Sequence, residues 1–126
     1  MVEPFVSRRD GGVVNDLGTP AVITSVAIAS ALGATSAYTR LRLPLTEEME
    51  RVVAVMTLPT VLLEGDRNEA PDATFAKWER ALGLPGVRGL VAGRALLYPP
   101  DGSVEAAVDI AAHLVRATAV VEARHV

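Results

Sequence analysis

The sequence contains no cysteine, and it has little lysine, histidine or aromatic side chain. The absence of cysteine excludes disulfide bonds, thiolate nucleophiles and zinc sites with cysteine ligands. Lys77 is the only lysine, beside eleven arginines, so a mechanism that needs a lysine amine has a single candidate. The formal net charge of −3 gives no electrostatic attraction toward nucleic acid or an anionic membrane, and neither is expected as a partner.

Long hydrophobic runs are also missing, because no stretch has the unbroken apolar length of a membrane span. An acid and a proline stand near the start, where a signal peptide would need a basic segment. We therefore predict a soluble, cytoplasmic protein. Its 126 residues, half of them hydrophobic, are enough for a single domain over residues 1–126. No spacing of His, Asp or Glu predicts a metal site, and no cofactor is expected.

Strand and helix signals alternate along the chain. Short apolar runs predict strands at 1–6, 36–44, 59–63 and 87–93. Apolar residues at helical spacing, after capping residues, predict helices at 19–33, 46–56, 72–83 and from 103 onward. Polar, glycine-containing segments predict loops at 7–18 and 94–102. The result is four strand–helix units of roughly thirty residues, which fit either an open α/β sheet or half of a (β/α)8 barrel.

Short motifs over nearly the whole chain resemble the second half of a class I aldolase barrel. They are Glu3-Pro-Phe, Val14-Asn-Asp16, the segment 25–30, Ser36-Ala-Tyr38, Leu58-Pro-Thr60, the segment 84–91, Gly93-Arg94 and the segment 98–102. The similarity is to (β/α)8 proteins related to deoxyribose-phosphate, tagatose-bisphosphate and archaeal-type fructose-bisphosphate aldolases. It implies an α/β fold, the (β/α)4 half of a TIM barrel, whose parallel strands correspond to strands 5–8.

The resemblance also implies a chemistry. In that family a lysine on the sixth strand forms a Schiff base with a carbonyl substrate, and glycine-rich strand ends hold a substrate phosphate. This chain would then be a carbon–carbon lyase of carbohydrate metabolism that acts on a phosphorylated sugar or related hydroxy-carbonyl compound. The expected substrate- and phosphate-binding residues are Glu64, Gly65, Asp66, Gly93 and Arg94.

Arg42 stands where the resemblance places the Schiff-base lysine. A guanidinium stays protonated and does not act as an amine nucleophile, so we expect impaired catalysis. Glu3, at another strand end, is a candidate general acid or base. Equally, Arg42 could form an ion pair with Glu3 or Glu64. The alternative function is a non-catalytic anion-binding or interaction module derived from the aldolase barrel.

Half of a barrel leaves two open sheet edges and an apolar interior. We therefore expect a homo-oligomer, or a partner that supplies a complementing N-terminal half-barrel.

Overall fold

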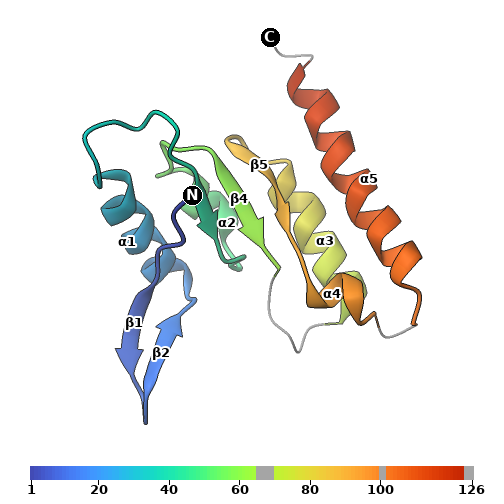
Figure 1. Ribbon diagram of the computed structural model, residues 1–126, viewed down its shortest axis with the longest axis horizontal. Coiled ribbons are helices and arrows are strands. Elements are labelled where there is room, and N and C mark those ends of the chain that lie inside the picture. Colours follow the sequence, from blue (N-terminus) through green and yellow to red (C-terminus); the bar gives the residue numbers. More distant parts are fainter. Residues whose placement is uncertain (65–69, 100–101, 124–126) are drawn as a thin grey trace.

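The computed structural model describes residues 1–64, 70–99 and 102–123, which form two small sheets and five helices (Figure 1). In chain order the elements are β1 (Val6–Arg9), β2 (Val13–Asp16), α1 (Thr19–Ser30), β3 (Leu41–Leu43), α2 (Met49–Val53), β4 (Thr60–Leu63), α3 (Pro71–Leu82), β5 (Val87–Val91), α4 (Arg94–Leu97) and α5 (Val104–Ala123). β1 and β2 pair antiparallel, whereas β3, β4 and β5 form a parallel sheet in that order.

The parallel sheet follows from two strand–helix–strand connections. α2 lies between β3 and β4 in the chain, and α3 lies between β4 and β5. On the outer side of β3, Val2 adds one isolated parallel bridge to Leu41. The Val2 N–H donates to the Arg40 carbonyl and the Arg42 N–H donates to the Val2 carbonyl, each at 2.9 Å. The N-terminal segment is thereby fixed beside the middle of β3.

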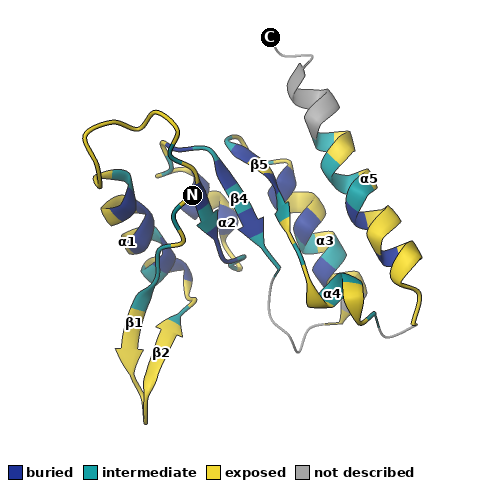
Figure 2. Cartoon of the chain, viewed as in Figure 1, coloured by how far each residue is buried: buried dark blue, intermediate teal, exposed yellow. Residues whose placement is uncertain are grey.

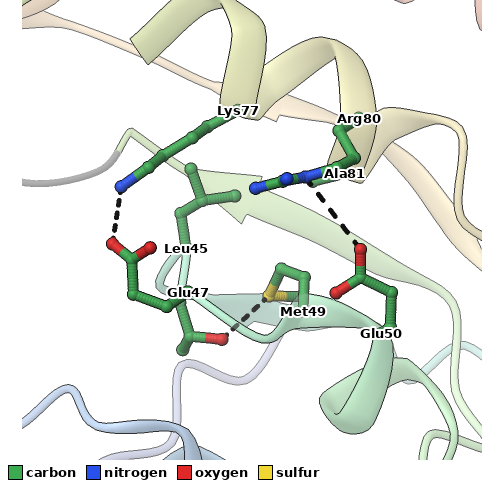
Figure 3. Close-up of a pocket in the computed structure, with 8 residues that line it drawn as sticks. Leu45, Glu47, Met49, Glu50, Lys77, Arg80 and Ala81 are labelled. Atoms are coloured by element: carbon green, nitrogen blue, oxygen red, sulfur yellow. Dashed lines mark hydrogen bonds and ion pairs between the residues drawn. The ribbon is translucent and has the colours of Figure 1, made fainter. Parts of the chain in front are cut away.

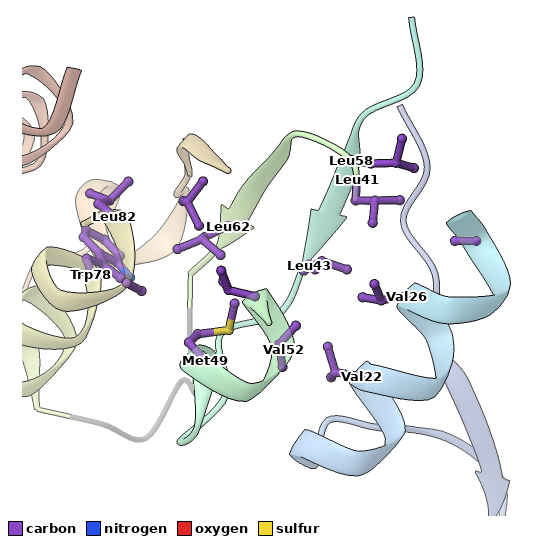
Figure 4. Packing of buried hydrophobic residues seen from close by; sticks show 14 of the residues in the cluster. Val22, Val26, Leu41, Leu43, Met49, Val52, Leu58, Leu62, Trp78 and Leu82 are labelled. Carbon is purple, nitrogen blue, oxygen red and sulfur yellow. The ribbon is translucent and has the colours of Figure 1, made fainter. Parts of the chain in front are cut away.

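The hydrophobic core lies on one face of this sheet, against α1, α2 and α3 (Figure 4). Because successive strand residues point to opposite faces, every second residue of β3 and β4 reaches the helices. Leu41, Leu43 and Leu62 are completely buried there, together with Trp78 of α3. Burial of these large apolar side chains is the main stabilising contribution to the fold.

The intervening strand residues form a second face that we call the open face, defined as Arg42, Val61, Leu63, Gly89 and Val91. Arg42 is paired with Val61, Val61 with Gly89, and Leu63 with Val91. None of these five residues belongs to the hydrophobic core cluster. In Figure 1, α2 and α3 lie behind the sheet, so that the open face has none of these helices packed on it.

Residues 7–18, predicted as a loop, instead form most of an antiparallel hairpin. Its turn contains Asp10, Gly11 and Gly12, and the Asp10 N–H donates to the Gly12 carbonyl at 2.9 Å. Gly11 has a φ of 65°, a conformation that glycine adopts at little cost. The hairpin extends away from the parallel sheet, and most of its residues are exposed (Figures 1 and 2).

The expected (β/α)4 half of a TIM barrel, with four parallel strands equivalent to strands 5–8, is therefore wrong. The first expected strand, residues 1–6, is reduced to the bridge at Val2, since the chain then turns away into the hairpin. The described residues contain three parallel strands and a separate antiparallel pair.

Two other segments differ from the prediction. The strand expected at 36–44 is limited to β3, because the Thr39 N–H donates to the Ser36 carbonyl in a turn and Tyr38 has a φ of 66°. The loop expected at 94–102 begins with the short helix α4. The predicted strands corresponding to β4 and β5, and the helices corresponding to α1, α3 and α5, are confirmed in position.

Adjacent leucines on β4 test the division of the sheet into two faces. Leu62 is fully buried in the core, whereas Leu63 is half-buried on the open face. Leu62→Ala should lower the free energy of unfolding by about 2–5 kcal/mol, because it leaves a cavity among packed side chains. Leu63→Ala should cost clearly less, about 1 kcal/mol, because water already reaches this side chain. Urea unfolding of both variants measures the difference, and equal costs would contradict a one-sided core.

Candidate functional site

Arg42 and Glu3 form an ion pair at the edge of the open face. The bridge at Val2 places Glu3 beside Arg42, whose Nη1 lies 3.4 Å from Glu3 Oε2. Each of the two side chains is 36% exposed. The Nε of Arg42 is buried and has no hydrogen-bond partner among the described residues. Arg42 therefore has hydrogen-bonding capacity that its contact with Glu3 leaves unused.

Glu64, directly after β4, holds the start of α4. Its carboxylate accepts hydrogen bonds from the backbone N–H groups of Gly93 at 2.7 Å, Arg94 at 3.2 Å and Ala95 at 3.2 Å. These are amides at a helix start, which lack partners within the helix. The strand itself brings Glu64 into position, since the Glu64 N–H donates to the Val91 carbonyl at 3.1 Å.

The expected site residues are thus only partly brought together. Glu64, Gly93 and Arg94 do meet, but the backbone amides expected to bind a phosphate are occupied by a carboxylate of the chain itself. The ion pair of Arg42 is with Glu3, one of the two partners that we considered. Gly65 and Asp66 lie outside the described residues.

Lys77 is placed away from the sheet edge, in contact with the segment before α2 (Figure 3). Its Nζ donates to Glu47 Oε1 at 2.6 Å, and Leu45, Met49 and Ala81 line the same small pocket. The hydrogen bond from Lys77, followed by its positive charge, holds the pKa of Glu47 below its ordinary value of 4.5. The only lysine of the chain therefore acts here in a cross-link between α3 and the segment leading into α2.

Among the residues that contact the Glu64 carboxylate, the sequence does not predict the backbone amide of Ala95. A backbone N–H carries no side-chain signal, and residues 94–102 were predicted as a loop. The available signal was Glu64 itself, a carboxylate at the end of a buried parallel strand. Such a position faces the start of the helix that follows the neighbouring strand.

Comparison with known proteins identifies one family and one solved structure. A family model described as Cgl0159-like matches residues 1–112. The crystal structure of Cgl0159 from Corynebacterium glutamicum is 61% identical in sequence over 91% of this chain, with a TM-score of 0.82. The chain spans 39% of the length of that protein. Comparison with curated proteins finds no match.

These findings correct the resemblance to class I aldolases. Both the matching family model and the similar structure are Cgl0159, and neither indicates an aldolase barrel. Membership in the aldolase superfamily, and with it the description of the chain as an aldolase-type lyase, is therefore wrong as an interpretation of the motifs. The binding roles expected for Glu64, Gly65, Asp66, Gly93 and Arg94 stay predictions. The motifs reflect similarity to a different family.

Removal of the Glu64 carboxylate should loosen the start of α4. Glu64→Ala leaves three N–H groups without their acceptor and should lower the free energy of unfolding by about 0.5–2 kcal/mol, as for a lost helix cap. Glu64→Gln should cost less, because its amide oxygen can still accept from Gly93 and Ala95. Amide hydrogen exchange of residues 93–95 should accelerate in Glu64→Ala.

Glu48→Ala is the control, because Glu48 is an exposed carboxylate that contacts Arg51 and does not cap α4. Unchanged exchange at residues 93–95 in Glu64→Ala would show that the contact is not stabilising.

Proposed function

This chain belongs to the Cgl0159-like family, and we propose that it binds a small carboxylate-bearing molecule at Arg42 without catalysing a reaction by itself. The single observation that carries the proposal is the state of the Arg42 guanidinium. It lies on the open face, it is partly accessible, and its Nε has no hydrogen-bond partner among the described residues.

The existing ion pair is weak enough to be replaced. Charge-assisted hydrogen bonds from arginine to carboxylate are shorter, about 2.7–2.9 Å, and frequently use two nitrogens at once. Arg42 Nη1 and Glu3 Oε2 lie 3.4 Å apart, and both side chains are partly in water. Ion pairs of this exposure contribute about 0–1 kcal/mol. A ligand carboxylate that engages two nitrogens can therefore displace Glu3.

The open face offers room next to Arg42. Val61 follows Arg42 across the sheet, and Gly89 follows Val61. Within the part of the chain that the structure describes, a Cβ added at Gly89 would meet only Cγ1 of Val61 within 4 Å, at 3.9 Å, which is ordinary van der Waals contact. The space above Gly89 is thus available to the apolar part of a ligand whose carboxylate reaches Arg42.

Catalysis through a lysine imine has no support in this arrangement. The guanidinium of Arg42 cannot form an imine, and the Nζ of Lys77 is engaged with Glu47 at 2.6 Å. Arg42 is, however, suited to exchange the Glu3 carboxylate for the carboxylate of a ligand. This supports the binding interpretation, and a small organic anion is accordingly the proposed partner.

This chain spans less than half of the Cgl0159 protein. No helix within the described residues is long and apolar enough to cross a membrane. The cytoplasm remains the proposed compartment.

Two substitutions should change ligand binding in opposite directions. Arg42→Gln should weaken binding of malonate or citrate by about tenfold or more, because one charge-assisted contact is worth about 1.4 kcal/mol or more. Glu3→Gln should strengthen binding several-fold, because it removes the competing carboxylate. Isothermal titration calorimetry at constant ionic strength measures both, with inorganic phosphate as a second ligand.

Arg8→Gln is the matched control, since Arg8 also contacts a single carboxylate, Asp10 at 2.9 Å, but lies on the hairpin. Equal binding by the wild type and Arg42→Gln, or an equal loss in Arg8→Gln, would refute a specific site at Arg42.

A further inference from the structure

The open face has the composition of a buried surface. Val61 and Leu63 alternate with Leu62, so that β4 carries an unbroken apolar run pointing to both sides of the sheet. Continuous hydrophobicity of this kind is typical of parallel strands that are covered on both faces. All-parallel sheets occur almost only with both faces covered, yet the core cluster of this chain contains residues of one face.

The similar solved structure has a longer chain than this one. At 61% identity and a TM-score of 0.82, Cgl0159 contains the same arrangement of β3, β4 and β5. More than half of the Cgl0159 chain has no counterpart in this sequence. A relative with so much additional polypeptide has material that could cover the face that is open here.

We infer that the open face is a docking surface for a polypeptide equivalent to the part of Cgl0159 that this chain does not match. The contact would be centred on Val61, Leu63 and Val91, which supply the apolar area. Gly89 would allow a partner side chain to approach the backbone of β5 closely, since among the described residues the nearest atom to an added Cβ is Val61 Cγ1, at 3.9 Å. Arg42 lies on β3, at the margin of this apolar area, and a docked polypeptide would compete with a ligand for the space above Gly89.

Gly89→Glu is designed to weaken docking of the partner while the chain itself still folds. Among the described residues, the Cβ of the new side chain would meet Val61 Cγ1 at 3.9 Å, an ordinary van der Waals contact. Its charge would be buried by a partner, which is costly. Ala76→Glu is the control, because Ala76 is an exposed residue of α3, on the opposite side of the sheet. The full chain is co-expressed with the unmatched part of Cgl0159, and complexes are measured by size exclusion with light scattering. The wild type and Ala76→Glu should form a one-to-one complex, and Gly89→Glu should weaken it by about tenfold or more.

A second measurement does not require the unmatched part to fold as a separate chain. In whole Cgl0159, glutamate at the position aligned with Gly89 should lower the Tm by about 5 °C or more, whereas glutamate at the position aligned with Ala76 should leave it nearly unchanged. An unchanged Tm of Cgl0159 with glutamate at the position aligned with Gly89 would overturn the inference. So would a wild-type chain that forms no complex with the unmatched part, or one that instead forms a dimer with itself that Gly89→Glu disrupts.

Discussion

The structure depends on the burial of one face of the parallel sheet formed by β3, β4 and β5. Leu41, Leu43 and Leu62 project from adjacent strands into a single core, where α1, α2 and α3 cover them. Apolar burial of this kind provides the main driving force for folding. Because side chains alternate between the two faces of each strand, the same packing determines which side chains reach the opposite face. The position of Arg42 is thus a consequence of the position of its two leucine neighbours.

The two carboxylates near the sheet have different environments and different roles. Glu64 accepts three backbone hydrogen bonds at the start of α4, which satisfies its charge within the chain. Glu3 has a single, longer contact with Arg42, in a position that water reaches. Exchange with an external anion is therefore expected at Arg42 and not at α4. Gly93 and Arg94 were expected to bind an anion of the substrate. Their backbone amides instead donate to the carboxylate of Glu64.

The extent to which the sequence predicts this fold depends on whether the signal is local. The apolar run at 59–63 and the helical periodicity at 72–83 are local, and both β4 and α3 are found there. The hairpin was missed although Asp10-Gly11 between short strands is a strong turn signal. The polar, glycine-containing composition of the segment predicts a loop instead. α4 was missed for a different reason, since it is four residues long and its start is held by Glu64, a residue thirty positions earlier.

The candidate site also contains one contact that local sequence signals predict and one that they do not. The contact between Arg42 and Glu3 was one of two expected ion pairs, and it could be expected because both residues lie near strand ends. The backbone partners of Glu64 depend on the parallel register of β4 and β5, which no local pattern specifies. The motifs that resembled an aldolase barrel are shared sequence segments, and they do not by themselves determine how many strands pair. That number depends on where the chain turns, which is after Val2 and before β1.

The difference between the two faces of the sheet is the central claim, and solvent relaxation enhancement of methyl groups tests it most directly. A gadolinium chelate dissolved with the monomeric chain broadens the NMR signals of methyl groups that water can approach. The methyl groups of Val61, Leu63 and Val91 should be strongly broadened, and those of Leu41, Leu43 and Leu62 should be protected. Equal protection of both sets in the monomer would contradict the account, because the open face would then already be covered by the chain itself.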